Sequence, residues 1–188
     1  MRFGLLTGHL GIYKNGEGTL QIKLIQKMKT LLLVRHAKSS HSFEHSSDFD
    51  RPLNDRGYRE ATEMGRKLLK KKIAIDLFMS SPALRAKTTA ELFVTEYGRK
   101  LKEILFIPTL YHAGPDNFSV VIGELDNSYQ HIAIFSHNPG ITDYATALST
   151  THITNMPTSS VFAVTAPVDS WKDFADAEKS FLFFLKPE

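Results

Sequence analysis

Short apolar runs alternate along the chain with segments in which apolar residues recur at helical spacing. The runs are bounded by polar or turn-forming residues and are rich in β-branched and aromatic side chains, so they predict buried strands. These predicted strands span residues 30–34, 73–79, 104–107, 131–135, 160–166 and 180–185. The last two lie close enough in sequence to form an antiparallel pair.

Helical periods fill the intervals between the first five strands. The predicted helices cover residues 54–72, 81–98 and 114–125, and a turn followed by a helix covers residues 136–148. Because strand alternates with helix, the pattern predicts an α/β fold, a three-layer α/β/α sandwich around a mostly parallel central sheet.

Two of the helices carry more specific signals. In the second helix, Ser81 is predicted as the N-cap, Pro82 as the first helical residue and Gly98 as the stop. In the first helix, one apolar stripe is predicted to face the core. It consists of Tyr58, Ala61, Met64, Gly65, Leu68 and Leu69.

Residues 1–27 differ from the rest because they contain five glycines and show no sustained period. They also lack the basic start, apolar middle and small-residue cleavage site of a signal peptide. Met28 is followed directly by the first predicted strand. We therefore expect residues 1–27 to be an N-terminal extension outside the core fold, and residues 28–188 to form a single domain. The alternative is an added hairpin or arm that packs on the domain.

Composition narrows the class of protein. The 188 residues, 42% hydrophobic and 23% charged, suit one domain with its own core. A net charge of +3 with interspersed acids and bases gives little support for a nucleic-acid partner, and no apolar run approaches the length of a membrane span. The chain has no cysteine, which excludes disulfides and thiolate nucleophiles and is compatible with the predicted cytoplasmic location. His41, His45 and His112 lack a close ligand spacing, so we interpret them as surface residues and predict no metal.

Four polar residues follow predicted strands directly or open the next helix. Arg35 and His36 follow the first strand in LLLVRHAKSS, Arg85 lies in the first turn after the second strand, and His137 follows the fourth strand in FSHNPG. The carboxyl ends of parallel strands meet at one edge of a sheet, where ligands bind. If the first, second and fourth strands are neighbours, the four side chains converge.

Two arginines, two histidines and a helix amino terminus make a concentrated site for an anion. A phosphoryl group fits this set, because guanidinium binds its oxygens in a fork and free helix N–H groups add partial positive charge. Neutral imidazole is a competent nucleophile near neutral pH, and adjacent cations should keep His36 unprotonated. These arguments predict a phosphohistidine intermediate but leave open whether His36 or His137 carries it.

The motifs LLLVRHAKSS, DRPLNDRG, SSPALRAKTTAEL, FSHNPG and MPTSSV together resemble the histidine phosphatase superfamily, with the phosphoglycerate-mutase-like fold. Within it they are most similar to phosphohistidine phosphatases of the SixA type, from about Met28 to the C-terminus. The resemblance implies that His36 is the nucleophile and that Arg35, Arg85 and His137 hold the phosphoryl oxygens. It places Lys38 and Ser39 on the rim as further binding residues, and it implies no cofactor.

One departure from the wider superfamily concerns the acid that protonates the leaving group. Many members carry a glutamate after the third strand, whereas this chain has TLYHAGPDNF, with His112 and Asp116. A phosphorylated imidazole can be protonated on its other nitrogen and so leaves without such an acid, unlike an alkoxide. The expected substrate is therefore phosphohistidine on a protein, although a carboxyl group from the loops could also supply a proton. The candidates are Glu44, Asp48, Asp50 and Asp116.

Other readings stay open beside this one. The same fold could serve a broad phosphatase of small phosphate esters, or a mutase that retains its product. A non-catalytic module that binds phosphoproteins would keep the pocket without turnover. A nucleotide-binding fold of the Rossmann type is disfavoured because no glycine-rich turn follows the first strand.

Overall fold

The computed structural model describes residues 9–14, 16, 20–25, 27–40, 47–149 and 153–188. Six strands form one sheet in the order β5-β4-β6-β3-β7-β8. Their bounds are β3 Lys29–Arg35, β4 Leu77–Ser80, β5 Ile104–Phe106, β6 His131–Ser136, β7 Val161–Ala166 and β8 Ser180–Leu185. The pairs β4–β5, β4–β6 and β3–β6 are parallel, and β7 pairs antiparallel with both β3 and β8. The sheet is therefore mostly parallel, as predicted.

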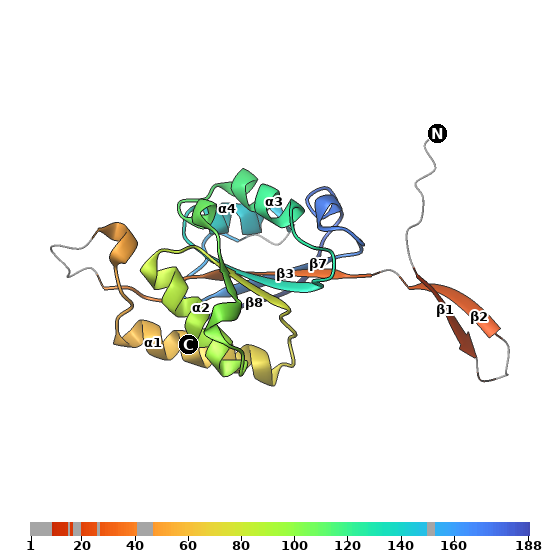
Figure 1. Cartoon of the computed structure of the whole chain (residues 1–188), viewed down its shortest axis with the longest axis horizontal. Helices are drawn as coiled ribbons and strands as arrows, with labels where there is room; N and C mark the ends of the chain where they lie inside the picture. Colours follow the sequence, from red (N-terminus) through yellow and green to blue (C-terminus); the bar gives the residue numbers. More distant parts are fainter. Residues whose placement is uncertain (1–8, 15, 17–19, 26, 41–46, 150–152) are drawn as a thin grey trace.

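Helices cover both faces of this sheet, which gives three layers (Figure 1). Their bounds are α1 Asp55–Lys70, α2 Leu84–Glu96, α3 Pro115–Gly123 and α4 Gly140–Ala147. Four short 3-10 helices span Asp48–Asp50, Leu101–Glu103, Pro108–Leu110 and Trp171–Asp173. Apolar side chains of α1 and α2 share a core with one face of the central strands, and those of α3 and α4 share a core with the other. The predicted α/β/α sandwich is confirmed.

The central strand is β6, which lies between β4 and β3. The first, second and fourth predicted strands are thus direct neighbours, which was the condition for the site residues to converge. Strand β3 is fully buried from Lys29 to Val34, which explains why its sequence is apolar on both faces.

Several predicted boundaries differ from the structure. Strand β4 begins at Leu77 rather than at residue 73, because residues 71–76 turn the chain out of α1. Helix α2 begins at Leu84 with Ala83 as its N-cap, so Ser81 does not cap it and Pro82 lies before it. Gly98 does end α2, in the left-handed conformation at φ +64° that glycine adopts without strain.

The predicted stripe of α1 is wrong at two positions. Tyr58 and Leu69 are each 45% exposed, whereas Gly57 and Glu60 face the interior. Ala61, Met64, Gly65 and Leu68 are buried as expected. The buried face therefore shares four of the six predicted positions and is rotated about the helix axis by less than one residue position.

The N-terminal segment forms a separate two-stranded antiparallel sheet, β1 His9–Lys14 and β2 Leu20–Ile25. It lies beside the amino end of β3 and apart from the six-stranded sheet (Figure 1). The alternative that the sequence left open was a hairpin or arm that packs on the domain; β1 and β2 do form a hairpin, but it lies apart from the six-stranded sheet. That residues 28–188 form an independent domain stays a prediction.

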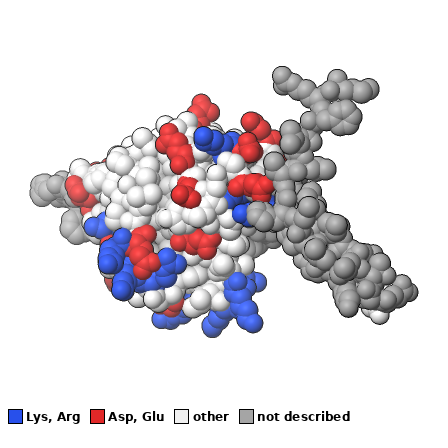
Figure 2. All heavy atoms as spheres, turned by 45° about the vertical axis from the view of Figure 1, so that its right-hand side comes forward, with Lys and Arg blue, Asp and Glu red and all other residues white. Residues whose placement is uncertain are grey.

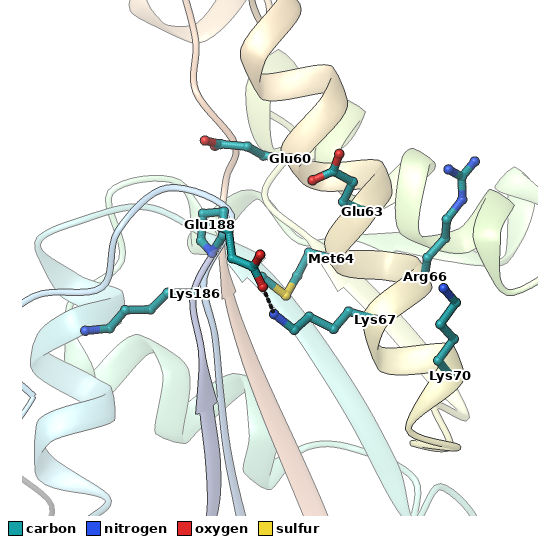
Figure 3. Close-up of a pocket in the computed structure, with 9 residues that line it drawn as sticks. Glu60, Glu63, Met64, Arg66, Lys67, Lys70, Lys186 and Glu188 are labelled. Atoms are coloured by element: carbon teal, nitrogen blue, oxygen red, sulfur yellow. Dashed lines mark hydrogen bonds and ion pairs between the residues drawn. The ribbon is translucent and has the colours of Figure 1, made fainter.

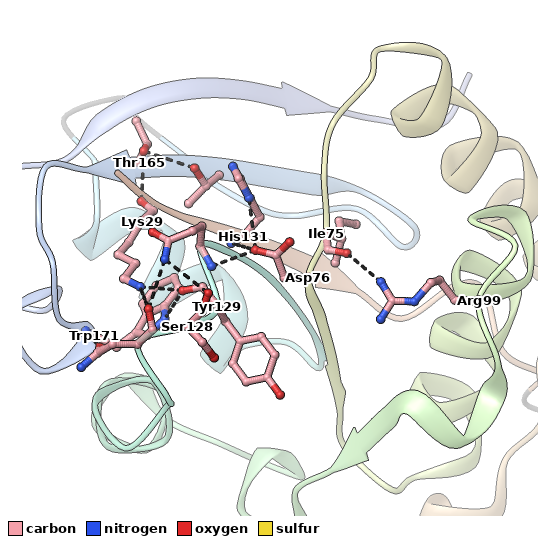
Figure 4. A network of polar contacts seen from close by, with 12 residues as sticks. Lys29, Ile75, Asp76, Arg99, Ser128, Tyr129, His131, Thr165 and Trp171 are labelled. Atoms are coloured by element: carbon pink, nitrogen blue, oxygen red, sulfur yellow. Dashed lines mark hydrogen bonds and ion pairs between the residues drawn. The ribbon is translucent and has the colours of Figure 1, made fainter. Parts of the chain in front are cut away.

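The amino edge of the sheet is closed by a polar network (Figure 4). The Lys29 ammonium donates to the carbonyl oxygens of Asn127 and Tyr129 at 2.7 and 2.6 Å. The Asp76 carboxylate accepts from the backbone N–H groups of Gln130 and His131, both at 2.8 Å. These contacts tie the start of β3 to the loop that enters β6.

The outer surface carries charges of both signs. On the face in Figure 2, basic side chains gather toward the lower part, and acidic ones lie among and above them. No helix among the described residues is long and apolar enough to cross a membrane.

Candidate active site

The four predicted site residues converge at the carboxyl edge of the sheet. Arg35 is the last residue of β3 and pairs in register with Ser136 of β6, so His36 and His137 follow adjacent strand ends. Their ring centroids are 5.1 Å apart. The Nε atom of Arg85, on the second residue of α2, lies 3.4 Å from Nε2 of His36.

A cavity of about 300 Å³ opens over these residues. Its walls come from six segments of the chain, and they include both predicted rim residues. It is lined by Arg35, His36, Lys38, Ser39, Asp48, Arg51, Arg85, His112, His137, Asn138 and Thr158.

The imidazole of His36 is held in an orientation that suits its predicted role as a neutral nucleophile. Its Nδ1 lies 2.8 Å from the carbonyl oxygen of Ala37, a contact that places the proton on Nδ1 and leaves the lone pair on Nε2. Burial lowers the pKa of His36 to about 3; the contact with Ala37 opposes this, and the charges of Arg85, Arg35 and Arg51 lower it further. The expected unprotonated state is thus supported, but burial contributes more than the neighbouring cations.

His137 is held by Ser81 across the sheet edge. Its Nε2 lies 2.8 Å from the Ser81 hydroxyl, which can donate to it. Among the residues that the structure describes, none hydrogen-bonds the buried Nδ1 of His137. Burial lowers its pKa to about 2, with further lowering by the charges of His36 and Arg85. Ser81 therefore positions a site histidine instead of capping α2.

Arg35 is anchored by the segment before β7. Its NH1 group donates to the carbonyl oxygen of Met156 at 2.6 Å, and its buried Nε has no hydrogen-bond partner among the described residues. The backbone N–H of Ser159 donates a hydrogen bond to the carbonyl oxygen of Arg35 at 3.2 Å. The motif MPTSSV thus holds this guanidinium, and Thr158 from it lines the cavity. Because β3 includes Arg35, the strand continues one residue beyond the expected end at Val34.

Arg85 is engaged by the 3-10 turn Asp48–Asp50. Its NH2 group contacts the Asp48 carboxylate at 2.9 Å, and its NH1 group donates to the backbone carbonyl of the same residue. The Tyr111 hydroxyl donates to that carboxylate at 2.9 Å, and Arg51 lies 3.4 Å from its other oxygen. Burial alone would raise the pKa of Asp48, but Tyr111, Arg85 and Arg51 together hold it below its ordinary value.

The predicted rim residues occupy the loop after β3. Lys38 lines the cavity, and the buried Ser39 accepts a hydrogen bond from Arg51 at 3.0 Å. This loop packs directly on α1 at Gly57, where a Cβ atom would lie 2.1 Å from the carbonyl oxygen of Lys38. The glycine of DRPLNDRG therefore allows α1 to approach the catalytic loop.

Sequence reasoning missed several residues of the cavity wall. Arg51 and Asn138 carried no individual signal, and His112 was interpreted as a surface histidine, yet all three line the cavity. The available sequence hint was the place of His112 in TLYHAG, the region where many superfamily members carry their acid; in the structure His112 has a positive φ of 55°. The glycine of FSHNPG is Gly140. A side chain does not fit at this position, because a Cβ atom would lie 1.7 Å from the carbonyl oxygen of Ala113.

Two other expectations concern the neighbouring loops: a possible proton donor at Glu44, and histidines that were not expected to bind a metal. Glu44, His41 and His45 fall outside the described residues. Within the described part of the chain, no group of three or more metal-ligating side chains is placed to hold a metal ion.

A second hollow of about 360 Å³ lies between α1 and the C-terminal residues (Figure 3). Lys67 and Glu188 form an ion pair there at 3.1 Å. Its walls mix both charge signs, and the described residues that line it include no histidine, serine or threonine. The predicted nucleophile and the convergent cations lie instead in the cavity over His36.

Comparisons with known proteins agree with this geometry. The family model described as the histidine phosphatase superfamily (branch 1) matches residues 31–106, which span β3 to β5. An uncharacterised protein of Mycobacterium leprae (strain TN) is 34% identical over 119 residues, which cover 62% of this chain and 71% of that protein. The chain belongs to the histidine phosphatase superfamily. The predicted class of enzyme, a phosphatase, is thereby confirmed.

Solved structures support the fold of this histidine phosphatase domain. A protein from Nakamurella multipartitia that carries the name SixA superposes with a TM-score of 0.72 at 20% identity, covering 85% of this chain and 96% of that one. The protein histidine phosphatase SixA complexed with tungstate superposes with a TM-score of 0.71 at 22% identity, covering 84% and 97%. The SixA-like, phosphoglycerate-mutase-like architecture predicted from the motifs is confirmed.

Proposed function

We propose that this histidine phosphatase hydrolyses phosphohistidine on a protein through a covalent intermediate on His36. The observation that carries the proposal is the orientation of that imidazole. Its Nδ1 is bound to the Ala37 carbonyl oxygen, and its Nε2 faces the cavity next to Arg85. A buried neutral imidazole with its lone pair toward convergent cations is suited to attack a phosphoryl group.

In the first step the Nε2–P bond forms as the P–N bond of the substrate breaks. The substrate imidazole leaves as a neutral ring, because its other nitrogen already carries a proton. In the second step water attacks phosphorus, the Nε2–P bond breaks and inorganic phosphate leaves, while phosphate or solvent takes the proton from water. Arg35, Arg85 and His137 are proposed to bind the equatorial oxygens in both steps, with Lys38 and Ser39 at the rim.

The donors proposed for the phosphoryl oxygens support this assignment. The buried Nε of Arg35 and Nδ1 of His137 have no hydrogen-bond partner among the described residues. Buried polar atoms are rarely left unpartnered without a functional reason. A phosphoryl group over His36 would supply acceptors to both. The SixA structure that superposes on this fold is complexed with tungstate, a tetrahedral oxyanion of similar shape.

The state of Asp48 favours a phosphoramidate over an alkyl phosphate. This carboxylate is the one acidic side chain that lines the cavity among the described residues. Its pKa is held below the ordinary value, so it is ionised at neutral pH and poorly suited to protonate an alkoxide. Phosphohistidine needs no such proton donor.

A turnover panel tests the proposal. Wild type and His36→Ala are compared on a phosphohistidine protein, p-nitrophenyl phosphate and sugar phosphates. We expect wild type to prefer the phosphohistidine protein and to form an acid-labile adduct at residue 36, detectable by mass spectrometry. His36→Ala should lose both.

The matched control is His131→Ala, which removes a histidine at the opposite end of β6. It should retain full activity. Full activity of His36→Ala would refute the mechanism. A preference for sugar phosphates would identify a broad phosphatase of small esters, isomerised phosphoglycerate would identify a mutase, and binding without an adduct would identify a non-catalytic module.

A further inference from the structure

An internal carboxylate already binds the arginine that faces the nucleophile. The Asp48 side chain contacts Arg85 at 2.9 Å, accepts the Tyr111 hydroxyl at 2.9 Å and lies 3.4 Å from Arg51. It lines the same cavity as His36. The negatively charged carboxylate of Asp48 therefore lies among the cations that a phosphoryl group would contact.

The guanidinium of Arg85 is divided between two partners. Its Nε faces Nε2 of His36 at 3.4 Å, while NH1 and NH2 are directed at the backbone carbonyl and carboxylate of Asp48. A guanidinium binds a tetrahedral anion best through two parallel N–H donors. A phosphate that takes two donors of Arg85 must displace the Asp48 carboxylate from at least one.

We propose that Asp48 is a positioning residue that competes with phosphate for Arg85, lowers the affinity of the cavity for inorganic phosphate and so promotes product release. This inference rests on the proposed function and goes beyond it. The cavity wall carries the guanidinium groups of Arg35, Arg51 and Arg85, and without a counter-charge these cations would retain a dianionic product.

The competition persists across the neutral pH range. The charged groups that face Asp48 are Arg85 and Arg51, and the Tyr111 hydroxyl stabilises its ionised form. His36 and His137 across the cavity are neutral, since the pKa values of these two residues are lowered to about 3 and about 2. Asp48 therefore contributes a full negative charge whenever the enzyme is active.

A charge-neutral variant tests whether Asp48 competes with phosphate for Arg85 or only holds the Arg85 side chain in place. Asp48→Asn keeps the backbone carbonyl contact to Arg85 and a side-chain oxygen for Tyr111, but removes the charge. Because the Asp48 side chain is 45% exposed, solvent screens its charge, and we expect inorganic phosphate to bind about five-fold more tightly to the variant. The inhibition constant of phosphate against p-nitrophenyl phosphate should fall by the same factor, KM should fall and kcat should not rise.

The matched control is Asp50→Asn, which removes a carboxylate from the same 3-10 turn whose partner is the Ser47 hydroxyl. It should leave phosphate affinity unchanged. Calorimetry with inorganic phosphate requires no turnover, so this test succeeds or fails independently of phosphoryl transfer to His36. Unchanged or weaker phosphate binding in Asp48→Asn would overturn the inference and leave Asp48 as an anchor of Arg85. Asp48→Ser provides the same comparison if the asparagine variant does not fold.

Discussion

The two ends of strand β3 hold cations in opposite ways: Lys29 is buried, whereas Arg35 is half-buried. At the amino end, the Lys29 ammonium donates to two backbone carbonyl oxygens and lies 5.3 Å from the centre of the Trp171 ring (Figure 4). At the carboxyl end, Arg35 donates to the Met156 carbonyl oxygen, but its buried Nε has no partner among the described residues. One cation closes a network, and the other lines a cavity and keeps one buried donor unpaired among the described residues.

This difference indicates two roles for cations within one strand: Lys29 stabilises the fold, and Arg35 is suited to bind a ligand. A buried cation whose donors are used by the backbone holds elements together, and its loss leaves carbonyl groups unpaired. A buried cation with an unused donor contributes less to folding and is suited to bind an anion. The same substitution at both ends of β3 should therefore produce opposite results.

The largest expected effect is that of Arg35→Met on catalysis. The variant loses a charged donor to the phosphoryl group, so kcat/KM for phosphohistidine protein should fall about a hundred- to a thousand-fold. The free energy of unfolding in urea should fall by only about 1 kcal/mol, the cost of one lost hydrogen bond. A variant that unfolds readily yet retains wild-type kcat/KM would place Arg35 with the structural cations.

Lys29→Met is the reciprocal change. It leaves the carbonyl oxygens of Asn127 and Tyr129 without their donor, and the free energy of unfolding should fall by about 2–4 kcal/mol. The kcat/KM of the folded fraction should match wild type, because Lys29 lies at the opposite edge of the sheet from His36. A selective loss of turnover with unchanged stability would break the comparison.

Gly57→Ala should disturb both stability and the site. Its Cβ atom would lie 2.1 Å from the Lys38 carbonyl oxygen, so the catalytic loop or α1 must shift. We expect the free energy of unfolding to fall by about 1–3 kcal/mol, with a higher KM.

The control for this change is Gly123→Ala at the end of α3. No atom lies within 4 Å of a Cβ there, so this variant should be neutral or slightly more stable. Thermal unfolding and steady-state kinetics on both variants provide the measurement. Equal behaviour of the two variants would show that the contact at Gly57 is unimportant.

The smallest effect concerns pH. His36 and His137 have folded pKa values lowered from 6.5 to about 3 and about 2. The unfolded chain therefore binds more protons below pH 6.5, and stability is lost as pH falls from there toward pH 3. At pH 5.5 each histidine should cost about 1.4 kcal/mol relative to neutral pH.

Urea unfolding at several pH values tests this slope. His36→Ala and His137→Ala should each flatten it, and His131→Ala, which removes a partly exposed ring, should change it less. A slope that both site variants leave unchanged would mean that other groups govern acid stability.

Much of the site followed from the sequence because strand ends are local features. Arg35, His36 and His137 each stand at the end of an apolar run, and parallel pairing then brings them together without knowledge of loop structure. Arg85 was found in the same way, from its place after β4. The single assumption was strand adjacency, and the order β4-β6-β3 satisfies it.

The rest depended on tertiary contacts that no local pattern encodes. The segment before α1 was predicted as a polar loop from which Asp48 could supply a proton, but no local pattern indicated that its carboxylate would bind Arg85 from 37 residues away. Ser81 has the sequence of a helix cap, but the neighbouring strand brings His137 to its hydroxyl instead. His112 lies in a loop whose direction is set by contact between the chain at Ala113 and Gly140.

The contact between Arg35 and Met156 joins positions 121 residues apart. During synthesis the nucleophile His36 leaves the ribosome long before the segment that fixes its neighbouring guanidinium has been translated. A nascent chain stalled before Met156 would carry every proposed catalytic side chain and yet lack the support for one of them. Enzymatic competence should therefore arise late in translation, only after β7 has emerged and closed the edge of the sheet beside β3.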